Sequence, residues 1–561
     1  MRREVSVVNK KVCSFPILFA LLALLIGTCA VVFPASAQAA PTSTGSITVS
    51  GTVASSYDAY QIFSANVVDG DSDAKIATDL AWVSDAVRDA ALPVLHSAGM
   101  PNSQTTAQEA AEWLNTDSHL TSALSAQLAR SLQSSGAESV ALNAGTAAEL
   151  SCGYWLIVAK DDAIAQGEAG TAPIMALVGG SAVTVKPKAA TPKVAKHVLE
   201  DSTAAWQKAA DATVADDLYW RLSATVPAGL TAYDTYTVRF VDTMSAGLDP
   251  SKVAASMRVY VAAGADGGFD AVSAGKDGRA GTEPAKGWTD ITAQCGVSVD
   301  GKTFTVRTGD LIAALGGVDA FTAGARVVAV YNAPLNSACN HGIAKGNPNE
   351  VYLRYPRSPF ADQSGDAGFT CTPSDDACAY TWDLALTKRG NDGDKPLAGA
   401  VLSIADDRGR TLAADGTWDA EGKATVTTGE DGRVTVSGVD SGKLEVRELK
   451  APKGYTAFEG TRSVTVKAEG LDVDQVAAAK PKLTITAESP LRADSADGST
   501  GSLEASLINT PTGTPPSITT GGFMPSTGDM AMYAAAAAAV AGAALIVVAL
   551  LVKRGGGSHK E

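Results

Sequence analysis

Polar side chains recur, at two places along the chain, where alternating strands would bury apolar ones. Side chains two residues apart share one face of a β-strand, so residues of equal parity share one environment. By this rule two segments each turn a lysine, an acid and an asparagine toward the expected core, in that order. These residues are Lys196, Asp242 and Asn349 in the first segment and Lys388, Glu448 and Asn509 in the second. One such strand-end residue would simply reach solvent, but the repeated set indicates a shared function.

The chemistry open to each set is acyl transfer. Burying a lone ammonium or carboxylate is expensive, so the lysine pKa is expected to fall and the acid pKa to rise. A neutral amine beside an asparagine carboxamide can attack its carbonyl carbon, and a protonated acid can polarise that carbonyl. The reaction gives a Lys–Asn amide and releases ammonia. In this scheme Asp242 and Glu448 are the catalytic groups.

Strands of β-sandwich modules are expected to position these residues. A length of 561 residues corresponds to roughly three to four domains. Residues 40–188 begin and end with strand-like segments and carry alanine-rich stretches of helical spacing between them, which predicts a mixed α/β domain. Residues 189–360 and 379–511 consist of short alternating strands separated by turns, which predicts tandem immunoglobulin-like sandwiches in a mainly β protein. No lysine occurs between Ala40 and Ala74, so the first domain is expected to lack an internal Lys–Asn bond.

Both ends of the chain carry features of processing signals. Residues 1–39 combine a basic start, an apolar run and small residues before the expected cut, which is the pattern of a secretory signal peptide. Residues 524–561 contain an apolar run at 530–552 and a basic tail, and this run is long enough to span a bilayer. A plain single-pass membrane anchor is the alternative interpretation of this end. Residues 512–523, rich in Pro, Thr and Gly, are expected to form an extended stalk.

Charge and motif content argue against several other functions. The net charge is −15 and no stretch is rich in lysine and arginine, so a nucleic-acid partner is not expected. The sequence has no Gly-x-Ser-x-Gly, His-Glu-x-x-His or phosphate-loop motif and no cysteine pair with zinc spacing. We therefore expect neither an enzyme nor a cofactor or metal site. The aspartate-rich turn at 69–73 could bind calcium, but a solvated turn is the favoured interpretation.

Five cysteines remain after removal of the signal peptide, and secretion would expose them to an oxidising exterior. Cys371 and Cys378 are close enough in sequence to close a small loop, and Cys295 with Cys339 is the next most plausible disulfide. Cys152 is then left over. It lies in an apolar run, where a buried thiol without a reaction partner is expected.

Several segments resemble motifs of sortase-assembled major (backbone) pilins of Gram-positive bacteria. The pentapeptide Met-Pro-Ser-Thr-Gly at 524–528 is similar to the Leu-Pro-x-Thr-Gly sorting signal, with methionine in place of leucine. Residues 444–455 look like the E-box of these pilins, and residues 240–248 and 349–355 resemble segments of their middle domain. The resemblance covers nearly the whole mature chain. It implies tandem CNA-B-like domains that form internal isopeptide bonds by themselves, here Lys196–Asn349 with Asp242 and Lys388–Asn509 with Glu448.

The resemblance also implies how subunits would be joined. In that family a sortase cuts between the threonine and the glycine of the sorting signal, here Thr527–Gly528, and transfers the threonine carbonyl to a lysine of the pilin motif. That motif ends in Tyr-Pro-Lys, and this chain has Lys-Pro-Lys at 186–188. Lys188 therefore takes the acceptor position, Lys186 is a competitor because it replaces the tyrosine, and Lys193 is a weaker one.

The expected product is a covalent cell-surface fibre that serves adhesion. The resemblance implies a class C pilus sortase, a housekeeping sortase, identical subunits and peptidoglycan as partners, with tip and basal pilins as further candidates. It implies a secreted, wall-anchored protein that the C-terminal segment retains transiently in the membrane. The alternative is a monomeric wall-anchored adhesin, or a minor or basal pilin, with the same stalk but no acceptor lysine. The sequence identifies no host ligand.

Overall fold

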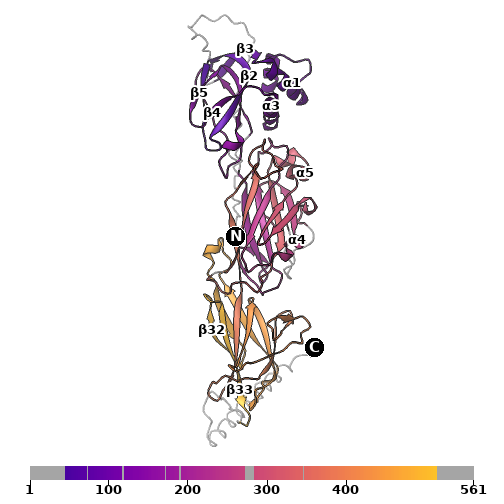
Figure 1. Cartoon of the computed structure of the whole chain (residues 1–561), viewed down its shortest axis with the longest axis vertical. Helices are drawn as coiled ribbons and strands as arrows, with labels where there is room; N and C mark the ends of the chain where they lie inside the picture. The colour runs from indigo at the N-terminus through magenta and orange to yellow at the C-terminus, as the bar shows by residue number, and fades with distance from the viewer. Residues whose placement is uncertain are drawn as a thin grey trace, which may run out of the picture.

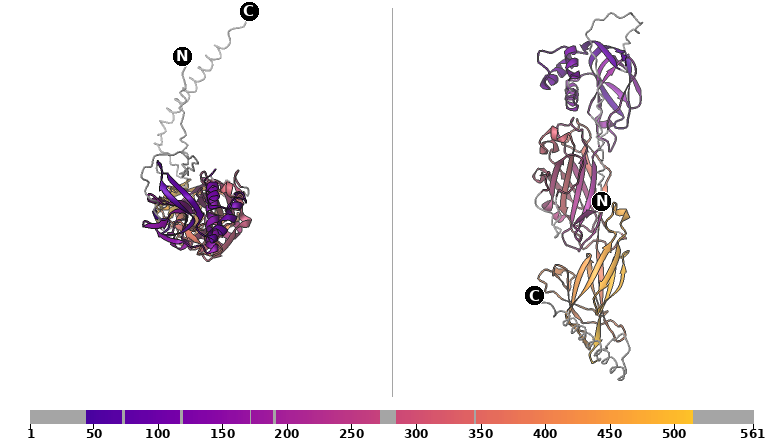
Figure 2. Two further views of the ribbon diagram at one scale, coloured as in Figure 1. Left: turned by 90° about the horizontal axis from the view of Figure 1, so that it is seen from above. Right: turned by 180° about the vertical axis from the view of Figure 1, so that it is seen from behind.

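The computed structural model forms an elongated rod of three modules that follow one another along its long axis (Figure 1; seen from above and from behind in Figure 2). The structure describes residues 44–71, 74–116, 119–170, 172–188, 191–271, 284–344 and 346–513. The expected signal peptide, most of the stalk and the sorting signal with Thr527 and Gly528 therefore lie outside the described residues. Among the described residues, no helix has the length and apolar character needed to cross a membrane.

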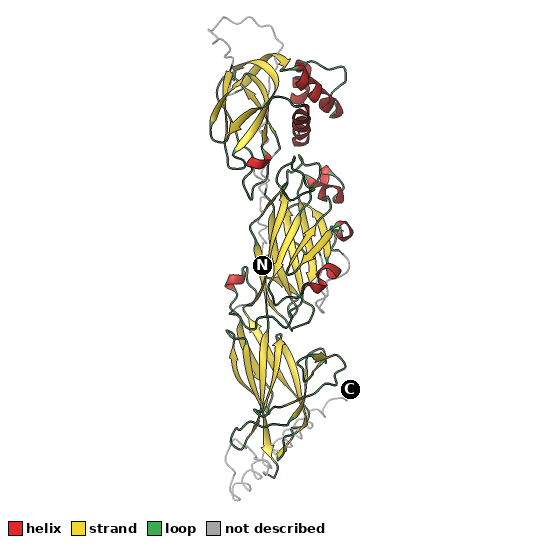
Figure 3. Cartoon of the chain, in the orientation of Figure 1, coloured by secondary structure: helices red, strands yellow, loops and turns green. Residues whose placement is uncertain are grey.

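The N-terminal module combines two small sheets with three helices that lie beside the larger sheet (Figure 3). The sheets have the strand orders β5-β1-β8 and β3-β2-β6-β7, and β4 pairs with β2. A threonine or serine hydroxyl caps the first turn of each helix, as is typical of helix starts. The elements are β1 (Thr44–Val49), β2 (Ser56–Asp69), β3 (Lys75–Trp82), α1 (Asp85–Ser97), α2 (Ala107–Asn115), α3 (Ser122–Ser135), β4 (Val140–Asn143), β5 (Ala147–Ser151), β6 (Gly153–Ala159), β7 (Ile174–Val178) and β8 (Val183–Val185).

The middle module is a sandwich of two sheets with the orders β10-β9-β12-β18-β14-β15 and β11-β21-β19-β13-β17-β16, the latter extended by β20 beside β19. Three short helices, α4 to α6, connect its strands. The elements are β9 (Lys193–Glu200), β10 (Ala205–Gln207), β11 (Ala209–Asp211), β12 (Tyr219–Val226), β13 (Arg239–Met244), α4 (Val253–Ser256), β14 (Arg258–Ala263), β15 (Thr289–Asp290), β16 (Gly296–Asp300), β17 (Thr303–Arg307), α5 (Leu311–Ala314), α6 (Val318–Phe321), β18 (Ala325–Asn332), β19 (Asn347–Pro356), β20 (Phe369–Cys371) and β21 (Asp375–Tyr380). Because β20 and β21 pair with β19, the middle sheet continues beyond residue 360.

The C-terminal module is a second sandwich, with the strand orders β27-β22-β33-β29 and β25-β24-β23-β28-β30-β31; β32 pairs with β33, and β26 with β23. Its first strand, β22, lies parallel to its last strand, β33. The elements are β22 (Trp382–Gly390), β23 (Val401–Ala405), β24 (Thr411–Leu412), β25 (Trp418–Asp419), β26 (Val426–Thr427), β27 (Arg433–Val439), β28 (Gly442–Lys450), β29 (Tyr455–Thr456), β30 (Thr461–Glu469), β31 (Lys482–Ala487), β32 (Leu491–Asp497) and β33 (Ser502–Pro511). The prediction of a mainly β protein with tandem sandwiches after a mixed module is confirmed.

Direct hydrogen bonds join the middle and C-terminal modules. The indole of Trp382, at the start of β22, donates to the Asp211 carboxylate at 2.6 Å, and the backbone N–H of Ser441 donates to the same carboxylate at 2.9 Å. The Asp211 amide in turn donates to the Glu200 carboxylate at 3.1 Å. This junction therefore gathers buried acidic groups between two modules.

Candidate functional site

Three strands bring the first Lys–acid–Asn set together inside the middle module. Lys196 lies on β9 in one sheet, whereas Asp242 on β13 and Asn349 on β19 lie in the facing sheet. Strands β13 and β19 are neighbours, and Asp242 pairs with Val351, two residues from Asn349, so both side chains share the inner face. All three side chains are completely buried. The three residues that strand alternation grouped in the sequence therefore lie together in the core of the sandwich.

The phenol of Tyr331 on β18 joins these three side chains. The Lys196 ammonium contacts the Asp242 carboxylate directly and lies 2.9 Å from the Tyr331 hydroxyl. That hydroxyl donates to Asp242 Oδ2 at 3.0 Å and accepts from Asn349 Nδ2 at 2.8 Å. Sequence reasoning missed Tyr331, because a tyrosine on an apolar strand looks like an ordinary core residue. Tyr331 lies two and four residues from Ala329 and Val327 on that strand. This spacing places its side chain on the inner face and could have indicated its position.

Burial changes the protonation of this set in the predicted directions. The pKa of Lys196 falls to about 8 because burial disfavours its charge, although Asp242 partly restores it. The pKa of Asp242 is raised by burial, against the opposing effect of Lys196. Within the described part of the chain, Asp242 Oδ1 and Asn349 Oδ1 have no hydrogen-bond partner. Proton transfer from the Lys196 ammonium to the Asp242 carboxylate would thus leave a neutral amine and a neutral acid. The Asn349 Oδ1 atom would then be available to accept a hydrogen bond from the protonated acid.

The second set meets in the C-terminal module with a different geometry. Lys388 on β22 and Asn509 on β33 lie on adjacent parallel strands of one sheet, and Glu448 on β28 reaches them from the facing sheet. Lys388 Nζ lies 3.4 Å from Glu448 Oε1 and donates to the Leu507 carbonyl at 3.3 Å. Asn509 Nδ2 donates to both Glu448 oxygens, at 2.9 and 3.0 Å. Burial lowers the pKa of Lys388 to about 8, with Glu448 opposing the shift.

The candidate acceptor lysines lie between the first two modules. Strand β8 ends at Val185, and Lys186 and Lys188 follow it with exposed side chains on either side of the buried Pro187. Lys193 is exposed at the first position of β9. Exposure therefore does not by itself choose among these lysines.

The predicted disulfide between Cys371 and Cys378 is wrong, because both thiols are free in the structure. Both residues lie on strands that pair with β19, but Cys371 is opposite Arg354 and Cys378 is opposite Pro348. Six residues along a strand correspond to about 20 Å, whereas disulfide-bonded Cα atoms lie within about 7 Å. Cys371 and Cys378 are close in sequence, but the chain between them is extended along the sheet, so the two residues are far apart in space.

The predicted disulfide between Cys295 and Cys339 is wrong for a similar reason, since these thiols are also free. Cys295 precedes β16, whose first residue lies level with Arg239 at the start of β13. Cys339 packs against Gly247, just past the other end of β13, where an added Cβ would lie 2.6 Å from its Cα. Opposite ends of a strand are too far apart for a disulfide. Cys152 is buried, as expected.

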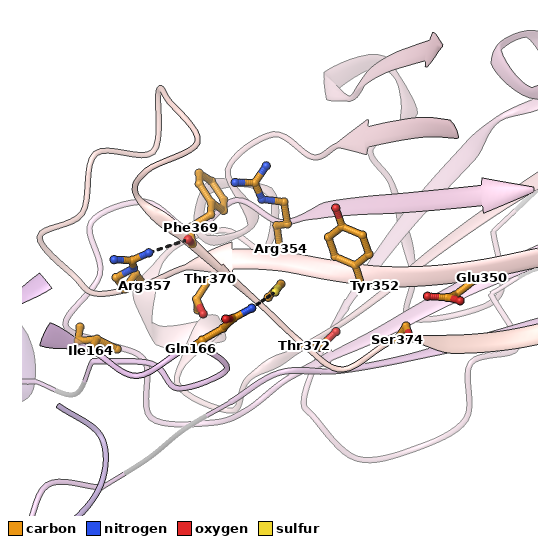
Figure 4. A pocket seen from close by; sticks show the side chains of 11 residues that line it. Ile164, Gln166, Glu350, Tyr352, Arg354, Arg357, Phe369, Thr370, Thr372 and Ser374 are labelled. Carbon is orange, nitrogen blue, oxygen red and sulfur yellow. Dashed lines mark hydrogen bonds between the residues drawn. The ribbon is translucent and has the colours of Figure 1, made fainter. Parts of the chain in front are cut away.

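The described residues contain no cluster of three or more His, Cys, Asp or Glu side chains that could hold a metal. In the aspartate-rich turn, the Asp69 carboxylate already accepts hydrogen bonds from Ser181 and contacts Lys75. A pocket of about 530 Å³ lies at the junction of the first two modules, between Gln166 of the N-terminal module and Tyr352 of the middle one (Figure 4). None of the Lys–acid–Asn residues lines it.

The fold and the two buried sets define a class of protein: tandem β-sandwich modules in which each core holds a buried lysine, acid and asparagine. These side chains are linked through Tyr331 in the middle module and through Glu448 in the C-terminal one. Residues 383–480 match the model of the SpaA family, which describes a prealbumin-like fold domain. This match lies within the C-terminal module.

Comparison with known proteins finds partial similarity to a streptococcal surface protein and to solved structures of pilins. The trypsin-resistant surface T6 protein of Streptococcus pyogenes serotype M6 is 29% identical over 143 residues, which is 24% of this chain and 24% of that protein. The chain thus matches about a quarter of the length of this curated relative. Among solved structures, the T6 backbone pilin of the same organism aligns over 84% of this chain and 98% of its own, with 16% identity and a TM-score of 0.44. The major pilin SpaD of Corynebacterium diphtheriae aligns over 83% and 98%, with 16% identity and a TM-score of 0.39.

Proposed function

We propose that this chain is a structural subunit of a covalent cell-surface pilus that serves adhesion. The observation that carries the proposal is the complete burial of Lys196, Asp242 and Asn349, with Lys196 in direct contact with Asp242 and Asn349 joined to both through the Tyr331 hydroxyl. A charged set of this kind gains stability by becoming a neutral amide cross-link. The match of residues 383–480 to the SpaA family model and the similarity to a streptococcal surface protein support it further. The protein acts as a building block and as a substrate of sortases, and its internal bonds form without another enzyme.

The bond in the middle module forms by attack of the Lys196 amine on the Asn349 side-chain carbonyl. A proton first moves from the Lys196 ammonium to Asp242, which the lowered lysine pKa and the raised acid pKa both favour. The neutral acid then polarises the carboxamide through the free Asn349 oxygen. The new N–C bond replaces the C–Nδ2 bond, and ammonia leaves.

The bond in the C-terminal module follows the same stoichiometry from a different starting contact. Here the carboxyl of Glu448 already holds Asn509 Nδ2, which is the atom that must leave as ammonia. Lys388 Nζ lies beside the same carboxyl. Glu448 can therefore take a proton from the amine and deliver it to the leaving nitrogen.

Assembly joins one subunit to the next through the exposed linker after the N-terminal module. A class C pilus sortase cuts the sorting signal of one subunit and transfers Thr527 to Lys188 of another, and a housekeeping sortase attaches the completed fibre to peptidoglycan. Lys186 and Lys188 are both exposed beside the buried Pro187, and we assign the acceptor role to Lys188 because it occupies the lysine position of the pilin motif. The side chain can therefore enter a sortase from a fixed point on the subunit.

Single lysine changes in cells that carry the cognate sortase test the proposal. Surface extracts boiled in detergent should give a ladder of covalent multimers for the unchanged chain and for Lys186→Ala, and only monomer for Lys188→Ala. The reverse pattern would move the acceptor to Lys186. A ladder that survives both changes would reject this linkage site, and an unchanged chain without any ladder would favour a monomeric wall-anchored adhesin.

A further inference from the structure

The hydroxyl of Tyr331 makes hydrogen bonds to every reacting side chain of the middle module. Its ring is completely buried and meets the ring of Phe304 edge to face, with centroids 4.7 Å apart. A phenol has one donor and two acceptor positions. All three are used here, since the hydroxyl donates to Asp242 and accepts from Lys196 Nζ and Asn349 Nδ2 at 2.8 to 3.0 Å. Lys196 Nζ must lose a proton and Asn349 Nδ2 must gain one during amide formation. Both nitrogen atoms are therefore hydrogen-bonded to the same Tyr331 oxygen.

We propose that Tyr331 is a catalytic proton relay for the Lys196–Asn349 bond, an inference that rests on the proposed internal bond. When Lys196 Nζ attacks the Asn349 carbonyl carbon, the attacking nitrogen has one proton too many and the leaving nitrogen has one too few. The Tyr331 hydroxyl gives its proton to Asn349 Nδ2 and takes one from Lys196 Nζ. The N–C bond forms, the C–Nδ2 bond breaks, ammonia departs, and the phenol ends unchanged.

The C-terminal module shows why a relay is needed in one module and not in the other. Asn509 Nδ2 donates directly to both oxygens of Glu448, so that acid reaches the leaving nitrogen by itself. In the middle module the hydrogen bond of Asn349 Nδ2 goes to the phenol, and the phenol stands between that nitrogen and Asp242. Glutamate is one methylene longer than aspartate, and the Tyr331 hydroxyl bridges the corresponding gap.

The protonation state of Tyr331 suits this role. Burial and the neighbouring Asp242 raise the pKa of Tyr331 well above its ordinary value, so the phenol carries a transferable proton at neutral pH. The phenol therefore supplies a proton to the leaving nitrogen while the protonated Asp242 polarises the Asn349 carbonyl. A tyrosine kept only for packing would leave the pH dependence of bond formation unchanged.

Pulsed cell-free synthesis of the mature chain, quenched in acid at intervals, tests the relay. Digestion and mass spectrometry then measure the Lys196–Asn349 and Lys388–Asn509 cross-linked peptides separately. Tyr331→Phe should slow the first bond by about 100-fold or more, the scale of general acid–base catalysis, and leave the second bond unchanged as an internal control. Phe304→Leu is the matched packing control, because it disturbs the ring that contacts Tyr331 and keeps the hydroxyl.

The pH dependence separates proton transfer from packing. In the unchanged chain the rate should rise with pH toward the pKa of Lys196, about 8, and then level off. In Tyr331→Phe the rate should instead fall as the pH rises, because no other proton donor contacts the leaving nitrogen among the contacts that the structure describes and the proton must come from solvent. If this variant fails to fold, difluorotyrosine at position 331 keeps the hydroxyl and its shape while making it more acidic. The rate should then change by at least about threefold.

The outcomes are distinct. Equal rates and equal pH profiles for the unchanged chain and Tyr331→Phe would overturn the relay while leaving the internal bond in place. An unchanged rate with difluorotyrosine would do the same. A wild-type chain that never forms the Lys196–Asn349 peptide would refute the bond itself, whatever the role of Tyr331.

Discussion

Glu200 should make the protein less stable as the pH rises from 5 to 8. Glu200 is 3% exposed at the junction of the middle and C-terminal modules, and its pKa is raised to about 7 by burial and then by the charge of Asp211. The same junction contains Asp440 and Asp201, whose pKa values are also raised, the first chiefly by burial and Asp211, the second by burial against the opposing charge of Arg408. Acidic groups therefore face one another from both modules.

The sign of the effect follows from proton linkage. An acid whose pKa is higher in the folded state binds more protons when folded, so its stabilising contribution is complete below the unfolded pKa and is lost as the pH rises through the folded pKa. For Glu200 this window runs from 4.5 to about 7. A shift of this size corresponds to a loss of about 3 kcal/mol in the free energy of unfolding. Solvent screens the Glu200 charge little, because the side chain is almost completely buried.

Glu200→Gln should remove this part of the pH dependence. Guanidinium unfolding at pH 5, 6, 7 and 8, followed by tryptophan fluorescence, gives the slope of stability against pH. The glutamine keeps one acceptor oxygen for Ser202 or Asp211, so the variant should resemble the unchanged chain at pH 5 and exceed its stability by up to about 3 kcal/mol at pH 8. Glu350→Gln, a change at an exposed glutamate of the same module, is the control. The same pH slope for Glu200→Gln and the unchanged chain would refute the reasoning.

Three further predictions concern the covalent state of the chain. The recombinant mature protein should weigh two ammonia masses less than its sequence mass, and Asp242→Ala and Glu448→Ala should each restore one, whereas an unmodified mass would contradict both internal bonds. The N-terminal module should be cleaved by protease before the other modules and should unfold first on heating. It should show no ammonia loss. Its lysines Lys75 and Lys160 contact carboxylates, and a cross-link mapped to either would overturn this prediction. Alkylation of the denatured, unreduced mature chain should label Cys295, Cys339, Cys371 and Cys378, because these four thiols form no disulfide in the structure; protection of any of them would show that a disulfide forms.

The sequence predicted the two buried sets because strand alternation is a local rule. Once Lys196 and Val198 share a strand, their common face follows from geometry, and three such strands in one sandwich share a core. The role of Tyr331 could not be predicted in this way. A tyrosine among valines and alanines fits any apolar strand, and only the three-dimensional meeting of β9, β13, β18 and β19 shows what its hydroxyl contacts.

The disulfide predictions failed because strand register is not a local property. The segment from Cys371 to Cys378 looks like a short loop in sequence, but its two ends pair with different parts of β19. The same non-local pairing extends the middle sheet through β20 and β21, which follow residue 360. Hydrophobic alternation indicates that a strand exists and leaves open which sheet it joins.

The order of the proposed bonds along the chain would explain why no such bond is expected in the first module. If subunits are joined from Thr527 to Lys188, tension enters each chain at Lys188, which follows the N-terminal module. Tension then passes through the chain from Lys188 to Thr527. Residues 44–185 carry none of it and need no internal cross-link. This arrangement leaves that module free to be the least stable part of the subunit.

The two bonds would also protect their modules to different extents. A Lys388–Asn509 bond carries tension directly between β22 and β33, the first and last strands of the C-terminal module. A Lys196–Asn349 bond carries it from β9 in one sheet to β19 in the other, so residues 197–348 are bypassed, but the segment from Asn349 to Lys388 stays in the loaded path. Fully drawn out, that segment would lengthen to about 130 Å. The strands β20 and β21 are thus the part of a pulled subunit that can yield, and the cross-links on either side limit how far it does so.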